Sequence, residues 1–166
     1  MWYAVPMQFR PYLTFSGTCA EAFTRYQEIF GGPLDLLTMA EAPGGAPEGT
    51  DPDLVLHASL TTEGGAHLMG ADHPAGDLTG PVHGMCVNVE LPTKEEAHRV
   101  FDDLSEGGTV QMPMGETFFS HAFGMCIDRF GTPWMVMAGT MPGARPGQGS
   151  TRFFRFAVDL ARHRSS

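Results

Sequence analysis

The stretch AEAFTRYQEIFGG at residues 20–32 has a counterpart further along the chain, KEEAHRVFDDLSEGG at residues 94–108. In both, apolar residues recur every three to four positions, the spacing of a helix that buries one face. Both end in a double glycine, and Gly31 and Gly107 can adopt the left-handed conformation that ends a helix. The two stretches therefore predict two similar helices. Their apolar positions are Ala22, Phe23, Tyr26, Ile29 and Phe30, and then Ala97, Val100, Phe101 and Leu104.

Segments of alternating, β-like composition surround each helix in the same order, one before it and three after it. A shift of 67 residues places Leu60 on Ile127 and Met69 on Val136. The chain is therefore predicted to be an α+β protein of two βαβββ units, which share a core because one small sheet with one helix leaves a face bare. The predicted strands are 11–15, 34–39, 54–60 and 66–70 in the first half and 85–91, 109–114, 123–130 and 133–138 in the second.

We expect one domain and a tail. The domain covers residues 1–142, with halves at 8–71 and 82–139 joined by a turn-rich hinge. A Gly/Pro linker at 143–150 leads to the tail, residues 151–166, whose apolar stripe predicts a helix that docks on the protein body or on a dimer partner.

The charge and composition of the chain limit the classes of partner that we expect. Residues 1–142 hold 5 Lys and Arg against 18 Asp and Glu, so this part carries −13, and such an acidic body repels nucleic acid. No apolar run reaches the roughly 18 residues that span a bilayer, and no signal peptide is recognised, so we expect a cytoplasmic protein without a membrane partner. Three cysteines, Cys19, Cys86 and Cys126, form no CxxC pair, which argues against a disulfide framework or a cysteine zinc site.

Three stretches resemble the signatures of PhnB-like proteins, a branch of the vicinal oxygen chelate superfamily that includes glyoxalases, bleomycin-resistance proteins and extradiol dioxygenases. They are PYLTFSGTCAEAFTRYQEIFGG from residue 11, LHASL with LMGAD from residue 56, and LSEGGTVQMPMGETFFSHAFGMCIDRFGTPWMVM from residue 104. The resemblance covers residues 9–139. It implies curved mixed sheets around a central cavity, and a homodimer whose modules pair within one chain or are exchanged between chains.

The resemblance also implies where a metal would bind. Metal-using members take one ligand from the first and last strand of each half, mostly His or Glu. Only His83 among the corresponding positions suits a hard or borderline metal, so we expect no four-ligand site and no cofactor. Those positions are Arg10 or Pro11, Leu68 or Met69, His83 or Gly84, and Met135.

Other residue patterns leave alternatives open. His57 and His67 lie on adjacent predicted strands and could be cross-strand neighbours, forming a two-histidine metal site with Glu116 or His83, or lining a ligand cavity. Glu116 is the first candidate general base, if buried, and His121 the second. Met112 with Met114, and Met135 with Met137, are predicted to share strand faces and could line a cavity that adapts to apolar ligands. The expected ligand-binding residues are His57, His67, His83, Met112, Met114, Phe119, Trp134 and Met135.

Two classes of function follow. The first is a binding module that sequesters an apolar or aromatic compound. The expected lack of four metal ligands favours this class. The second is a metal-assisted lyase, isomerase or dioxygenase acting on a substrate with neighbouring oxygens.

Overall fold

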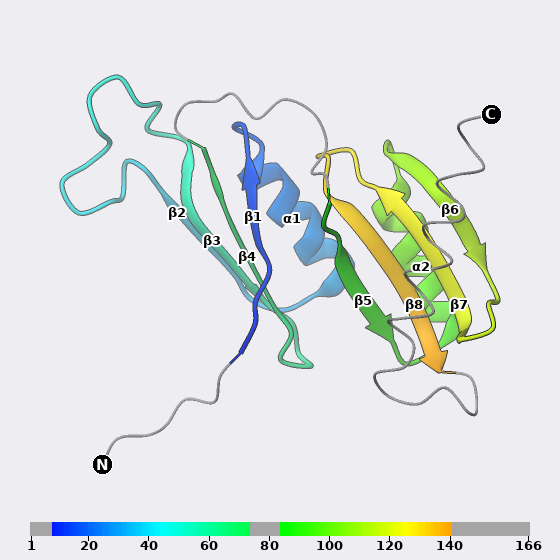
Figure 1. The fold of residues 1–166 in the computed structure, drawn as a ribbon. Coiled ribbons are helices and arrows are strands. Elements are labelled where there is room, and N and C mark those ends of the chain that lie inside the picture. Colours follow the sequence, from blue (N-terminus) through cyan, green and yellow to red (C-terminus); the bar gives the residue numbers. More distant parts are fainter. Residues whose placement is uncertain (1–7, 74–83, 141–166) are drawn as a thin grey trace, which may run out of the picture.

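The computed structural model describes residues 8–73 and 84–140. The predicted organisation is confirmed, because each half runs strand, helix and then three strands (Figure 1). The first half comprises β1 (Tyr12–Phe15), α1 (Cys19–Phe30), β2 (Leu34–Thr38), β3 (Val55–Thr61) and β4 (His67–Asp72). The second half comprises β5 (Val87–Leu91), α2 (Lys94–Ser105), β6 (Thr109–Gly115), β7 (Ser120–Ile127) and β8 (Pro133–Thr140).

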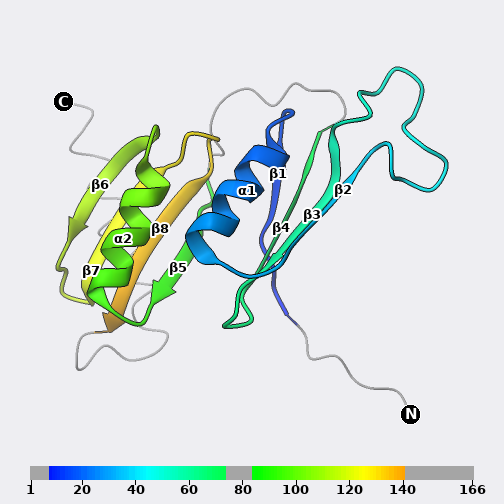
Figure 2. The same cartoon turned by 180° about the vertical axis from the view of Figure 1, so that it is seen from behind.

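The eight strands form two separate four-stranded sheets. The first sheet has the order β1-β4-β3-β2 and the second has the order β5-β8-β7-β6. Each half begins with a strand that pairs in parallel with the last strand of that half, and the remaining pairs are antiparallel. Each helix buries its apolar stripe against its own sheet, as Figure 2 shows from the helix side. Each sheet therefore has a face covered by its helix and an opposite face, called here the open face.

The double glycines fix how each helix returns to its sheet. A Cβ atom on Gly32 would overlap the backbone carbonyl of Thr61, and one on Gly108 would overlap that of Ile127. Thr61 is thus the structural counterpart of Ile127, a shift of 66 residues, so the predicted shift of 67 is wrong by one. In a strand, a one-residue slip moves every side chain to the opposite face.

Strand β7 also differs from its predicted bounds of 123–130, since it starts three residues earlier and ends at Ile127. The chain turns at Asp128, whose Oδ1 accepts hydrogen bonds from the backbone N–H groups of Phe130 and Thr132, both at 2.9 Å. A side chain that caps its own turn in this way competes with continuation of the strand.

The same Asp128 joins the two halves. The Tyr26 hydroxyl of α1 donates to Asp128 Oδ2 at 2.6 Å, and the Trp134 indole N–H donates to the same oxygen at 2.8 Å. Tyr26 is 0% exposed and its ring packs edge-on against Trp134, with centroids 5.2 Å apart. Burial and the nearby Asp128 carboxylate hold the pKa of Tyr26 far above its usual value. Helix α1 therefore lies between the sheets and serves both halves (Figures 1 and 2).

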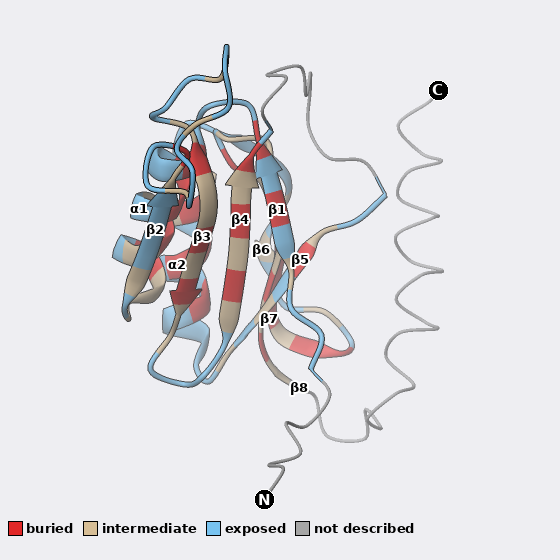
Figure 3. Cartoon of the chain, turned by 90° about the vertical axis from the view of Figure 1, so that its left-hand side faces the viewer, coloured by how far each residue is buried: buried red, intermediate tan, exposed pale blue. Residues whose placement is uncertain are grey.

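The two open faces point in different directions. Figure 3 looks onto the open face of the first sheet, whereas the open face of the second sheet is turned toward the viewer in Figure 1. The sheets are not closed into one barrel-like unit within the chain.

Several predictions concern segments outside the described residues. These are most of the hinge, His83, the linker at 143–150 and the tail at 151–166. Among the described residues, no helix has the length and apolar character to cross a membrane.

Candidate functional site

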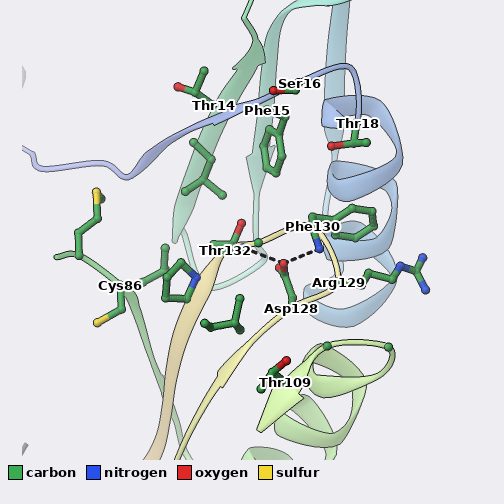
Figure 4. A pocket seen from close by; sticks show the side chains of 18 of the residues that line it. Thr14, Phe15, Ser16, Thr18, Cys86, Thr109, Asp128, Arg129, Phe130 and Thr132 are labelled. Carbon is green, nitrogen blue, oxygen red and sulfur yellow. Dashed lines mark hydrogen bonds between the residues drawn. The ribbon is translucent and has the colours of Figure 1, made fainter. Parts of the chain in front are cut away.

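A cleft of about 1030 Å³ lies where the two halves meet, between β1, the start of β5 and the β7–β8 turn (Figure 4). Threonine hydroxyls and two phenylalanines, Phe15 and Phe130, contribute to its walls. Asp128 contributes a carboxylate to the lining of the cleft. The two oxygens of this carboxylate already accept four hydrogen bonds. That carboxylate therefore holds the fold together and is not available as a base. Cys86 also lines the cleft, and burial raises the pKa of its thiol.

The open face of the second sheet is rich in methionine. Met135 and Met137 lie on it together, as predicted, because they pair with Asn88 and Glu90 in an unbroken ladder. Met125 pairs with Met135, and Met112 pairs with Met125. All four methionines are partly exposed. We call this group, Met112, Met125, Met135 and Met137, the methionine face.

Met114 does not belong to the methionine face, so the prediction that it shares a face with Met112 is wrong. The register of β6 shifts between Met112 and Gly115, and Met114 packs against the core under α2. Its sulfur lies 2.5 Å from where a Cβ on Gly124 would be. The extra residue of the β-bulge turns the side chain to the covered face.

Aromatic and imidazole groups border the methionine face. Phe119 is buried and packs edge-on against Phe123, which pairs with Met137, with ring centroids 5.2 Å apart. His121 packs over Gly139, where an added Cβ would lie 3.0 Å from the imidazole Cδ2. The structure thus places these two predicted residues beside the methionines.

Two other predicted residues lie elsewhere. Trp134 is 1% exposed and belongs to the core, where its ring packs against Tyr26 and Phe30 of α1. Its strand position is one residue away from the open face. Glu116 has a side chain that is 58% exposed and forms an ion pair with Lys94 at 3.3 Å. The burial on which its prediction as a general base depended is not present in this chain.

The open face of the first sheet is polar. The Tyr12 hydroxyl lies 3.2 Å from His57 Nδ1, across the strand that separates them. His67 Nε2 lies 2.8 Å from Ser59 Oγ. The sequence predictions did not include Tyr12. The alternation along YLTF does place its side chain on the face of the strand that is opposite to the face of the buried Leu13.

His57 and His67 are not cross-strand neighbours. His67 pairs with Thr61, and Ala58 pairs with Gly70, so His57 falls opposite Ala71. The two histidines are therefore separated by four positions along the ladder, about 13 Å. Imidazoles at that separation cannot bind one metal ion, since zinc–nitrogen bonds are about 2 Å long.

The positions expected to carry metal ligands can now be placed in register. On the open faces, Tyr12 pairs with Met69 on the first and last strands of the first half. Asn88 and Met135 are the corresponding pair in the second half. Residues 8–73 and 84–140 contain no group of three or more His, Cys, Asp or Glu that could hold a metal ion.

Known proteins match this chain over most of its length. The family model described as 3-demethylubiquinone-9 3-methyltransferase matches residues 7–137. Protein YjdN of Escherichia coli strain K12 is 31% identical over 140 residues, covering 78% of this chain and 94% of YjdN.

Solved structures also match this chain over most of its length. Protein PA1353 of Pseudomonas aeruginosa has a TM-score of 0.70 and 39% identity, over 80% of this chain and 98% of its own. A Bacillus cereus protein titled a putative 3-demethylubiquinone-9 3-methyltransferase, PhnB protein, has a TM-score of 0.65 and 26% identity, over 80% and 100%. A glyoxylase/bleomycin resistance protein/dioxygenase domain from Frankia shares the fold at 15% identity and a TM-score of 0.55.

The paired βαβββ units, the family match over residues 7–137 and the identity to YjdN lead to one conclusion. This chain belongs to the PhnB-like family, described as 3-demethylubiquinone-9 3-methyltransferase, and has the glyoxalase/bleomycin resistance/dioxygenase fold.

Proposed function

We propose that this protein is a homodimeric small-molecule-binding protein that holds an apolar or aromatic compound against the methionine face. The observation that supports the proposal is the face itself. Met112, Met125 and Met135 are paired in a row across β6, β7 and β8, Met137 follows two residues along β8, and all four are partly exposed. A core would bury such residues, and a plain surface would carry charged ones.

Methionine suits this role because its side chain is unbranched and polarizable. It can adjust its rotamer to a flat or irregular ligand and makes favourable contacts with aromatic rings. Phe119 and Phe123 at the border of the face add flat apolar surface. Because contact area and dispersion would provide most of the affinity, the site would select ligands by shape and apolarity more than by charge.

The proposal includes a dimer because a single chain provides only one wall of the ligand site. The two open faces of a chain point in different directions, so neither covers the other (Figures 1 and 3). If two subunits pair about a two-fold axis, the first sheet of one can face the second sheet of the other, and two equivalent cavities result. Such pairing would also cover the edges of these small sheets.

The proposal is tested with an uncharged aromatic probe, N-phenyl-1-naphthylamine, whose fluorescence rises in an apolar site. We expect saturable binding by the native protein and at least a fivefold weaker affinity in Met135→Lys, because a charged group then lies in the apolar wall. Val110→Lys is the matched control, since Val110 pairs with Cys126 on the other face of the same sheet and is half-exposed. It should bind the probe as the native protein does.

Two outcomes would overturn this function. The first is the absence of saturable probe binding, or equal binding by Met135→Lys and native protein. The second is a stoichiometric divalent metal ion that survives gel filtration of untagged protein and is required for turnover of a substrate with neighbouring oxygens. That second result would establish the metal-assisted enzyme instead.

A further inference from the structure

The open face of the first sheet differs in chemistry from the methionine face. It carries a tyrosine, two histidines and the hydroxyl groups of Ser59 and Thr61. Asp35 pairs with Ser59, and Leu37 pairs with His57, so Leu37 and Met69 are apolar side chains of this face. Two of its hydrogen bonds join side chains on different strands, Tyr12 with His57 and His67 with Ser59. Both imidazoles are therefore held in a defined orientation before any ligand arrives, which lowers the entropic cost of binding through them.

The contact between Tyr12 and His57 spans the strand that separates them. Tyr12 lies on β1 and His57 on β3, and β4 runs between them. Tyr12 pairs with Met69 of β4 whereas His57 falls opposite Ala71, so the two rings meet on a diagonal across β4, with centroids 5.8 Å apart. The Tyr12 side chain stays 46% exposed in this arrangement.

The hydrogen bond decides which nitrogen of His57 is free to donate. We assign its hydrogen to Tyr12, because a neutral phenol is a stronger donor than an imidazole N–H, and an imidazole nitrogen is a stronger acceptor than a phenol oxygen. Burial raises the pKa of Tyr12, so this hydroxyl keeps its proton. Nδ1 of His57 is then the acceptor, and Nε2 carries the ring hydrogen. In the described part of the chain, Nε2 of His57 has no hydrogen-bond partner.

The charge of the protein limits what Nε2–H can recognise. Residues 1–142 carry −13, so the field around the protein disfavours an anionic ligand. An uncharged acceptor such as a carbonyl oxygen has no such penalty. An imidazole N–H at a defined position gains one hydrogen bond from a ligand with that oxygen and none from a hydrocarbon of the same shape.

We infer that the ligand is an uncharged aromatic carbonyl compound, whose rings lie on the methionine face and whose carbonyl oxygen accepts a hydrogen bond from Nε2 of His57. Tyr12 is a positioning residue that fixes the tautomer and orientation of His57. This inference rests on the proposed function, in which the first sheet of one subunit faces the second sheet of its partner.

The test compares three naphthalenes of similar size in displacement of N-phenyl-1-naphthylamine from the full-length protein. They are 2-acetylnaphthalene with a carbonyl acceptor, 2-ethylnaphthalene without one, and the anion 2-naphthoate. We expect the acetyl compound to bind about fivefold more tightly than the ethyl compound, the factor of one hydrogen bond between uncharged groups. The anion should bind more weakly than the acetyl compound.

Four variants locate the effect. His57→Phe keeps a ring but removes the donor, so the ratio between acetyl and ethyl compounds should fall to one or below, because the carbonyl oxygen then loses its water without gaining a partner. His57→Gln should largely retain the ratio, because its amide nitrogen can reach the place of Nε2. Tyr12→Phe should reduce the ratio without changing the affinity for 2-ethylnaphthalene. His98→Phe, on the exposed side of α2, should behave as the native protein.

The outcomes separate the two proposals. If the probe binds and Met135→Lys weakens it, but the acetyl and ethyl compounds bind equally to native protein, the carbonyl inference fails and the proposed function stands. An unchanged ratio in His57→Phe, or tightest binding of 2-naphthoate, would overturn the inference as well. If the probe does not bind at all, both proposals fail.

Discussion

The link between the halves can be tested by removing one oxygen atom, in Tyr26→Phe. The lost group is a fully buried hydroxyl that donates to Asp128 Oδ2 at 2.6 Å. Hydrogen bonds to a charged group contribute about 1.5–3 kcal/mol, so the free energy of unfolding should fall by about that amount. Asp128 would keep its bonds from Trp134, Phe130 and Thr132, which limits the loss.

The matched comparison is Tyr12→Phe, the same change at a half-exposed hydroxyl, which we expect to alter the free energy of unfolding by less than about 0.5 kcal/mol. Asp128→Ala should be worse than Tyr26→Phe, at about 3–5 kcal/mol, because it removes the acceptor of the Trp134 indole N–H and of the backbone N–H groups of Phe130 and Thr132. The Tyr26 hydroxyl would keep Thr132 Oγ1, at 3.0 Å, as its acceptor. Urea unfolding followed by circular dichroism measures all three. A Tyr26→Phe protein as stable as Tyr12→Phe would refute the reasoning that this bond holds the halves together.

The same residue predicts how stability depends on pH. The pKa of Tyr26 is raised in the fold, so its contribution is fully present below the pKa of the unfolded state, about 10, and is lost as pH rises above it. The free energy of unfolding of the native protein should therefore fall more steeply above pH 10 than that of Tyr26→Phe. Parallel curves for the two proteins between pH 9 and 11 would contradict this.

Three further predictions follow from the fold. Gly108→Ala should lower the free energy of unfolding by about 2 kcal/mol or more, because its Cβ would overlap a backbone carbonyl, whereas Gly115→Ala, which meets nothing within 4 Å, should cost far less. Burial raises the pKa of Cys19 to about 12 and of Cys126 to about 11, so native protein titrated with a thiol reagent at pH 8 should react first at Cys86, and equal rates for all three would disprove it. Sedimentation at micromolar concentration should give about twice the chain mass of 17.9 kDa, and a species of single-chain mass alone would rule out the dimer.

The sequence by itself determined the elements and their order. Helical spacing of apolar residues and the double glycines located both helices to within a few residues, because these signals are local. Alternating segments located the eight strands, and their repeated order identified two similar halves. The residues that resemble PhnB-like proteins led to the right family.

The tertiary structure decided which side chains meet. Strand faces depend on register to a single residue, and Trp134, which was predicted to bind the ligand, lies in the core because it is one position from Met135 along β8. The bulge that turns Met114 inward depends on how β6 fits β7, and the separation of His57 from His67 depends on how β3 pairs with β4. The two halves are joined by contacts such as that of Tyr26 of α1 with Asp128, which lie 102 residues apart in the sequence. No local pattern encodes such a contact, because it forms only when both halves have folded and packed together.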